Sequence, residues 1–359
     1  MKRFVTLMGM LVAFAYFQPQ MMPYVLAPLR PQSEADPTVD VRRSAMDHKV
    51  FVPIIYRPVN GLAVDVTDRA AVSQFYRDHY LGSASPSAGW TGSIGGCVAG
   101  DTSAEFKASV AHRINYYRAM AGLAADVKMK PEYNALAQAA ALMMSAQNSL
   151  SHTPGAGWAC YTQTGADGAA SSNLALGHNG SSSIFGYMQD RGTHNAPVGH
   201  RRWILYPFTT EFGTGDVPAT SGHAAANGLM VFGTFSTDRI ARDSFVAWPP
   251  PGFVPYQVVY PRWSFSLGAS GFDPIDFSNA TVSMTIDGVA TPVVIESADG
   301  ENDLGYGERA IVWRPTSMGD GASWPRPSTN SVIQIQISNV NYEGSMQSFN
   351  YTVTVIDPN

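Results

Sequence analysis

Apolar residues recur at helical spacing in the middle of the chain. The pair Thr102 and Glu105 has the spacing of a capping box, in which the hydroxyl accepts an amide hydrogen and the carboxylate reaches back to the start of the helix. A single apolar stripe follows, with intervals of four, four and three residues: Phe106, Val110, Ile114 and Tyr117. We therefore expect a helix that is capped by Thr102 and ends at Gly122.

The next segments predict further helices and short strands. Pro131 suits the first turn of a helix, and the apolar face that follows should continue to about Asn148. A third, shorter helix is expected over 182–190, and a helical pattern also occupies 68–80. Runs rich in β-favouring residues at 202–206 and 228–235 predict strands. The middle of the chain thus mixes helix and strand.

From residue 248 the hydrophobic period changes to two. The segments 281–286, 332–337 and 351–355 alternate polar and apolar residues between turns rich in Gly, Asn, Asp and Pro. This pattern predicts an all-β, immunoglobulin-like sandwich over 248–359, after a mixed domain over 101–247. Four tryptophans of this region form either a carbohydrate-stacking face or the core of the sandwich: Trp248, Trp263, Trp313 and Trp324.

The first residues have the pattern of a secretory leader. Lys2 and Arg3 precede an apolar run of about a dozen residues that ends in the small-x-small triplet 13–15. We expect residues 1–15 to be a signal peptide, 16–47 a proline-rich linker and 48–100 an N-terminal extension. A membrane anchor is the alternative, but polar residues from Gln18 interrupt the run before it reaches the roughly 20 residues that a span needs. The protein is therefore expected to be exported to the periplasm or the exterior, without a stable span after cleavage.

The composition of the chain excludes one class of binding partner. Apolar residues make up 45% of the 359 residues, which is enough for packed cores, and charged residues only 14%. The net charge of −5 leaves no broad basic field, so we expect no nucleic-acid partner. The composition says nothing about oligomeric state.

The chain has two cysteines, Cys97 and Cys160. An even count behind a leader favours a disulfide between them, because exported proteins meet an oxidising environment. Two buried free thiols are the alternative.

Four segments occur in the order of a known family. These are Asn115-Tyr116-Tyr117-Arg118 with Gly122-Leu123, Leu150-Ser151-His152, Ser172-Asn173-Leu174-Ala175 and Gly199-His200-Arg201-Arg202-Trp203-Ile204-Leu205. Together they resemble the CAP superfamily, also called SCP domains, which includes cysteine-rich secretory proteins, antigen five and plant pathogenesis-related proteins. The Gly-His-Arg-x-x-Ile-Leu form is similar to its bacterial branch, and the resemblance covers about 103–236.

The resemblance implies an α-β-α sandwich, so the fold class expected for the whole chain is α+β. It also implies a cleft with two histidines and two acidic residues that often binds zinc or another divalent cation. His152 and His200 match the histidines and are the candidate metal ligands. Ser172, beside Asn173, stands where the family has its first glutamate, and Asp190 replaces the second. The loss of a carboxylate weakens both metal binding and general-base catalysis, so no cofactor is assigned with certainty.

Two functions follow from this site. The first is an extracytoplasmic module that binds a small molecule, a lipid, a glycan or another cell-envelope component. The second is a metal-assisted hydrolase of peptide or cell-wall substrates that uses the histidine pair. No catalytic residue is assigned, and whether the chain is an enzyme stays open at this point.

Overall fold

The computed structural model describes residues 61–236, 239, 241–268, 273–303 and 306–359. The expected signal peptide, the linker and the first part of the N-terminal extension lie outside these residues. The described residues belong to one compact unit, 55–359. Within them, no helix is long and apolar enough to cross a membrane. The expected domain boundaries stay predictions.

Helix α2 (Ala104–Met120) forms where the apolar stripe predicted it, but with a different cap. Ser103, not Thr102, is the N-cap residue, and its hydroxyl accepts a hydrogen bond from the amide of Phe106 at 3.1 Å. The expected cap was therefore wrong by one residue. Gly122 has φ +73° and follows the last turn, as expected of the residue that ends a helix.

Three further helices form where the sequence predicts them. Helix α3 (Pro131–Gln147) ends at Asn148, which is left-handed, α5 (Ser181–Gln189) covers the expected third helix, and α1 (Arg69–Phe75) continues as a π-helical turn over Tyr76–Tyr80. Two helices differ from the prediction. Helix α4 (Gln163–Ala170) forms where no element was expected, and α6 (Gly199–Ile204) is helical although a strand was expected over 202–206.

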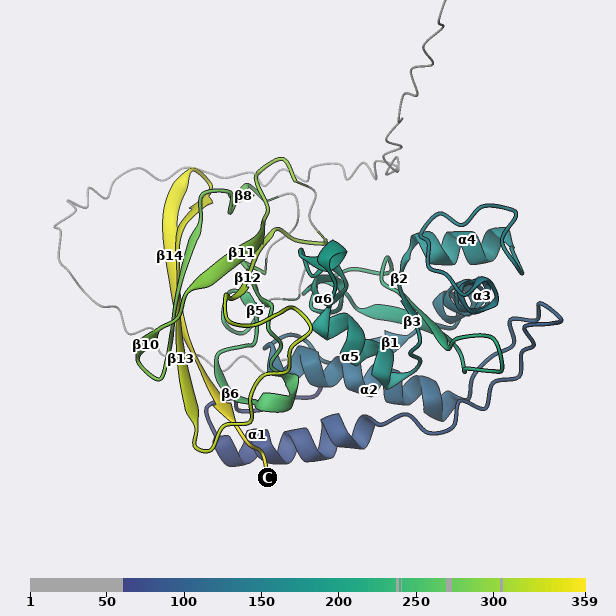
Figure 1. Ribbon diagram of the computed structural model, residues 1–359, viewed down its shortest axis with the longest axis horizontal. Coiled ribbons are helices and arrows are strands. Elements are labelled where there is room, and N and C mark those ends of the chain that lie inside the picture. The colour runs from purple at the N-terminus through teal and green to yellow at the C-terminus, as the bar shows by residue number, and fades with distance from the viewer. Residues whose placement is uncertain (1–60, 237–238, 240, 269–272, 304–305) are drawn as a thin grey trace, which may run out of the picture. The chain divides into compact units, whose positions relative to one another are not determined.

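A four-stranded sheet lies between these helices (Figure 1). Its order is β1 (Lys128–Met129), β3 (Glu211–Val217), β4 (Ala226–Met230) and β2 (Ser172–Leu176), so β2 is an edge strand. Helix α3 packs so closely on one face that a Cβ at Gly215 would lie 2.0 Å from the amide nitrogen of Gln138. Buried residues of α2 and α5 cover the other face, and the α-β-α arrangement is confirmed.

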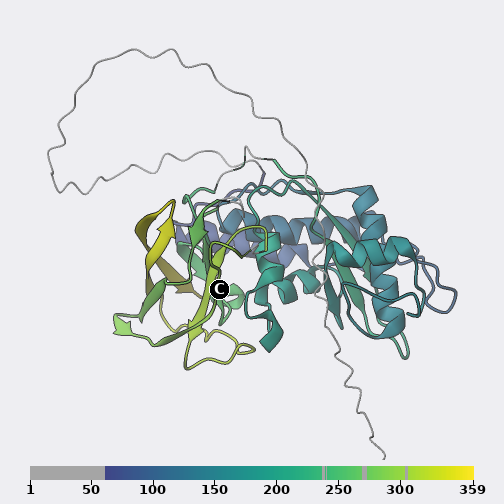
Figure 2. The same cartoon turned by 90° about the horizontal axis from the view of Figure 1, so that it is seen from above.

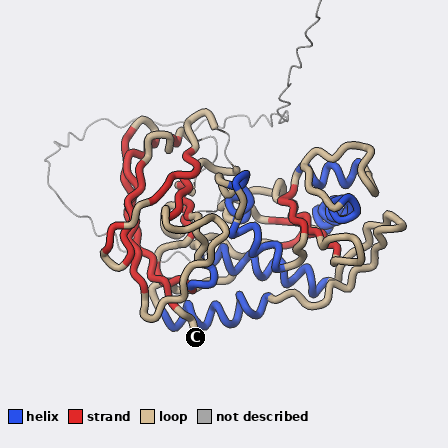
Figure 3. Tube along the Cα trace, viewed as in Figure 1, coloured by secondary structure: helices blue, strands red, loops and turns tan. Residues whose placement is uncertain are grey.

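Two further sheets form the sandwich that the period of two predicted, as Figure 2 shows in green and yellow and Figure 3 in red. One sheet has the order β10-β9-β13-β14-β6, with β8 on β13, and the other β11-β12-β7-β5. The strands are β5 (Val246–Trp248), β6 (Gly252–Pro255), β7 (Trp263–Ser266), β8 (Ile275–Asp276), β9 (Thr281–Ile286), β10 (Val289–Ala290), β11 (Val293–Ala298), β12 (Ala310–Pro315), β13 (Ser331–Tyr342) and β14 (Ser345–Ile356). The α+β class is therefore confirmed.

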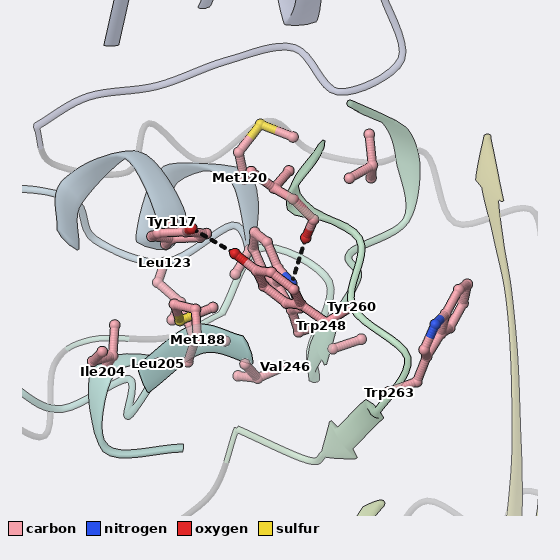
Figure 4. Close-up of a cluster of buried hydrophobic side chains, with 14 of the residues drawn as sticks. Tyr117, Met120, Leu123, Met188, Ile204, Leu205, Val246, Trp248, Tyr260 and Trp263 are labelled. Atoms are coloured by element: carbon pink, nitrogen blue, oxygen red, sulfur yellow. Dashed lines mark hydrogen bonds between the residues drawn. The ribbon is translucent and has the colours of Figure 1, made fainter. Parts of the chain in front are cut away.

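One hydrophobic cluster joins the sandwich to the helices (Figure 4). Trp248 on β5 packs its ring 5.1 Å from that of Tyr117 on α2 and donates a hydrogen bond to the carbonyl of Val258 at 3.1 Å. The hydroxyl of Tyr117 in turn pairs with that of Tyr260 at 2.7 Å. The core is thus continuous across the boundary expected between 247 and 248.

Two alternatives left open by the sequence are settled by burial and geometry. Cys97 and Cys160 form a disulfide with a Cα–Cα distance of 5.0 Å, so neither is a free thiol. The four tryptophans of the sandwich are all buried and therefore belong to the core rather than to an exposed stacking face: Trp248, Trp263, Trp313 and Trp324.

Candidate functional site

The best-defined polar pair of the predicted site is Asp190 with His200. Asp190 ends α5 in a left-handed conformation, and His200 lies in the first turn of α6. One carboxylate oxygen of Asp190 lies 2.7 Å from Nδ1 of His200, and the other accepts the backbone amide of His200 at 3.0 Å. Because a carboxylate accepts hydrogen bonds, Nδ1 carries the hydrogen that points to Asp190; in the neutral tautomer with this hydrogen, Nε2 is an acceptor.

Burial separates the roles of the two side chains. The Asp190 side chain is 1% exposed, whereas that of His200 is 24% exposed. Both oxygens of Asp190 bond to His200, and of the two side chains only the imidazole reaches solvent. Asp190 orients the ring and fixes its tautomer, as carboxylates behind functional histidines commonly do.

A buried network supports the ring of His200 from the other side. The ring of Tyr187 stacks on it, with centroids 5.3 Å apart and planes at 25°. The Tyr187 hydroxyl donates to Oδ1 of Asn227 at 2.8 Å, and Asn173 donates from Nδ2 to the carbonyl of His200 at 3.1 Å. Burial raises the pKa of Tyr187 well above its ordinary value, so this phenol stays neutral.

The network continues to Asp216 on β3. Asp216 is fully buried and accepts hydrogen bonds from Asn227 Nδ2 at 2.8 Å, the Thr214 hydroxyl at 2.7 Å and the amide of Gly180 at 2.6 Å. Burial raises the pKa of Asp216, and these three donors oppose the rise. The chain of contacts from Asp216 to His200 holds the ring in one position.

His152 and Ser172 lie apart from this network. Nδ1 of His152 lies 2.9 Å from the carbonyl of Ala169, and the side chain is exposed. Ser172 pairs with Met230, and the next residue, Asn173, pairs with Leu229, so their side chains point to opposite faces of β2. In the described part of the chain, no hydrogen bond joins His152 or Ser172 to His200. The structure thus brings together Asn173, Asp190 and His200.

One protein family matches the part of the chain that holds this arrangement. The sequence profile of the cysteine-rich secretory protein family, CAP, matches residues 111–233. Residues 111–233 form a CAP domain. Its limits enclose both predicted histidines, the whole Asp216–His200 network and helices α3–α6. Among curated proteins, none matches the chain significantly.

The residues of this CAP domain do not fit the metal site that the family resemblance implied. A tetrahedral zinc site needs at least three protein ligands. In the described ranges, no three His, Cys, Asp or Glu side chains come close enough to hold a metal ion. Asp190, the expected carboxylate ligand, has both oxygens on His200, and the other carboxylate is replaced by Ser172, so no step is derived through a metal.

Aromatic side chains surround α6 of the CAP domain. We call these residues the aromatic rim: Trp203, Tyr206, Phe208, Phe232, Phe235 and Tyr306. All of these rings except that of Tyr306 pack edge to face, with centroids 4.7 Å apart for Trp203 and Phe232 and 5.4 Å apart for Tyr206 and Phe235. Phe232, Phe235 and Tyr306 are 45%, 46% and 40% exposed, so much of the rim faces solvent.

The rim adjoins the His200 site at both ends of the helix. The ring of Tyr306 lies against Gly199, where a Cβ would be 2.6 Å from its Cδ1. The amide of Phe232 points to the carbonyl of Ser171 at 3.4 Å, next to β2. The rim therefore lies beside the helix that carries His200.

The sandwich holds the segment that carries the site. Arg262, at the start of β7, donates to the carbonyl of Asp190 at 2.6 Å, and Asp320 accepts from the amide of Gly192 at 2.8 Å. Arg201, next to His200, donates to the carbonyl of Arg262 at 2.9 Å. The sandwich therefore fixes both Asp190 and α6.

Sequence reasoning missed most of these supporting residues. The sequence assigns no role to Tyr187, Asn227, Asp216 or Arg262. The aromatic rim left a trace in the run Trp203, Tyr206 and Phe208, which has an aromatic residue every two or three positions. Because a strand is expected over 202–206, the sequence does not predict an aromatic surface around a helix.

Proposed function

We propose that this chain is an exported bacterial protein whose CAP domain binds a cell-envelope glycan without turning it over. The observation that carries the proposal is the exposed aromatic rim beside an oriented histidine. Exposed apolar patches of this kind on a soluble surface are typical of binding sites. Export is supported by the leader-like residues 1–15 and by the Cys97–Cys160 disulfide.

A glycan fits this surface better than a lipid does. A sugar ring has an apolar face that stacks on aromatic rings and a periphery of hydroxyls that needs hydrogen-bond partners. Nε2 of His200 offers an acceptor at one end of the rim. At the other end, beside Phe235, the carboxylate of Glu211 accepts from the Thr234 hydroxyl at 2.6 Å and lies 3.3 Å from Nζ of Lys130. An acyl chain would instead require apolar walls that exclude water.

The hydrogen bonds of Asp190 favour binding without turnover. A metal-assisted hydrolase would need a carboxylate free to hold the cation or to accept a proton, but both oxygens of Asp190 bond to His200. The described residues supply no second acid beside the imidazole, because Ser172 stands in its place. The metal-assisted hydrolase is therefore the less supported candidate.

A sedimentation assay with purified peptidoglycan sacculi tests the proposal. We expect the wild-type protein to pellet with sacculi, and Phe232→Ala and Tyr306→Ala each to weaken binding about fivefold, because one stacking contact contributes about 1 kcal/mol. Leu81→Ala and Met346→Ala are matched controls, since these side chains are 50% and 67% exposed but lie outside the rim. They should bind like the wild type.

Two outcomes would contradict the proposal. Binding to phosphatidylcholine vesicles but not to sacculi, with loss in Phe232→Ala, would assign the rim to a lipid. Release of soluble fragments from sacculi by a zinc-loaded protein, lost in His200→Ala, would favour the hydrolase.

A further inference from the structure

A small cavity lies where α6 meets the sandwich. It is enclosed by α6 and by β5, β7 and β12, and its volume is about 10 Å³. Arg201 and Arg202 line it from α6, and Glu308 lines it from the turn before β12. A cavity of about this size holds one water molecule.

Three buried polar atoms that lack partners belong to residues that line this cavity. Nη2 of Arg201, Nε of Arg202 and Oε2 of Glu308 have no hydrogen-bond partner among the described residues. The three side chains are 0%, 4% and 2% exposed as residues. Buried charged groups rarely stay unpaired, because each unmet hydrogen bond costs free energy.

Other nitrogens of the two arginine side chains already donate hydrogen bonds. Arg201 uses Nε on the carbonyl of Met188 at 2.7 Å and Nη1 on Arg262 and Ser264. Arg202 uses Nη2 on Asp299 and on the carbonyl of Glu308. Each guanidinium is therefore held in place, and neither can turn toward Glu308 without breaking these contacts.

We propose that this cavity binds one water molecule that links the CAP domain to the sandwich. The water accepts hydrogen bonds from Nη2 of Arg201 and Nε of Arg202 and donates one to Oε2 of Glu308. Three hydrogen bonds are typical of a buried water. The two N–H donors of the arginines use the two lone pairs of the water, and Oε2 of Glu308 accepts one of its hydrogens. All three unpaired atoms then have a partner.

The site gives Glu308 a positioning role for His200. Arg201 and Arg202 directly follow His200 in α6, so the water fixes the helix that carries the imidazole. Glu308 itself belongs to the sandwich and does not contact His200. The sandwich would then set the orientation of the CAP-domain histidine through a bound water.

A crystal structure of the wild-type protein at high resolution tests the water directly. We expect a density peak within hydrogen-bond distance of all three atoms. Direct pairing of either arginine with Oε2 of Glu308, or a cavity without density, would overturn the proposal.

Two variants test the same site in solution. Ala310→Val places two methyl groups beside the cavity, because Ala310 lines it. If the cavity holds the water, expelling it should lower Tm by at least about 3 °C, since three polar atoms lose their partner. If the cavity is dry, filling it should leave Tm unchanged or raise it.

The positioning role needs a separate readout. In Glu308→Met, we expect a shift of the His200 ring signals and of their pH titration in NMR spectra, whereas Glu343→Met, at a solvent-exposed site, should change neither. Unchanged His200 signals in a folded Glu308→Met protein would refute the positioning role.

Discussion

Arg118 is a buried cation whose whole hydrogen-bonding capacity is used by backbone carbonyls. It is 0% exposed. Nε donates to Ala124 at 2.8 Å; Nη1 donates to Ile204 and Tyr206 at 2.9 and 2.8 Å; Nη2 donates to Pro207 and Thr209 at 3.1 and 3.3 Å. The five donors of one guanidinium thus join the end of α2 to the segment that connects α6 with β3.

Replacing Arg118 by lysine keeps the charge but removes donors. An ammonium group has three hydrogens, so at least two of the five carbonyls lose their partner. Each buried acceptor left unpaired costs about 1–3 kcal/mol. We therefore expect Arg118→Lys to lower the free energy of unfolding by about 2–6 kcal/mol, a large part of the 5–15 kcal/mol typical of a folded protein.

Urea unfolding followed by tryptophan fluorescence measures this loss. With a slope of about 3 kcal/mol per molar urea, the midpoint should fall by about 0.7–2 M at an unchanged slope. Arg77→Lys is the matched control, because Arg77 is exposed and donates to the carbonyl of Pro358 at 2.6 Å and to Gln74 at 2.8 Å. Its midpoint should stay within about 0.3 M of the wild type. Equal midpoints for the two variants would refute the argument.

Three further predictions concern stability. Replacing both Cys97 and Cys160 by alanine should lower the free energy of unfolding by about 4 kcal/mol, because the disulfide closes a loop with a sequence separation of 63; an unchanged urea midpoint would contradict this. Burial raises the pKa of Glu308 to about 7, against bonds from Ser266 and Gly268 and the charge of Arg202. The folded state therefore holds the proton of Glu308 more tightly than the unfolded chain does. As pH rises from about 4.5 through 7, the free energy of unfolding should fall by about 3 kcal/mol relative to that of Glu308→Gln. Parallel pH profiles of the two proteins would exclude this. A fragment of residues 248–359 should give poorly dispersed NMR spectra, since Trp248 loses its packing on α2; well-dispersed spectra would show an independent domain.

Much of the local structure was predictable because it depends on neighbouring residues. The apolar stripe of α2, the proline at the start of α3 and the period of two in β9, β13 and β14 each satisfy a local rule, and each element formed. The cap of α2 was placed one residue early because Thr102 and Ser103 both offer a hydroxyl. The disulfide followed from having only two cysteines in a chain that begins like an exported one.

Helix α6 shows how tertiary contacts override local preference. Its last two residues, Trp203 and Ile204, favour strand, and six residues are too few to reveal a helical period. The structure instead satisfies the first turn with the side chain of Asp190, which accepts the amide of His200 from ten positions earlier. That contact exists only after α5 and α6 have packed, so no local pattern predicts it.

For the candidate site too, the sequence predicted some features and only the tertiary structure decided the others. The sequence by itself indicated His200 and Asp190, because both lie in segments with recognisable patterns. Only the tertiary structure decided that Asp190 serves the imidazole and that Ser172 points to the other face of β2. The tertiary structure also brings the aromatic rim together from α6, the loop after β4 and the turn before β12. One hydrophobic core continues from Tyr117 on α2 to Trp248 on β5. Long-range packing, which brings distant segments into contact, is the physical reason for each of these outcomes.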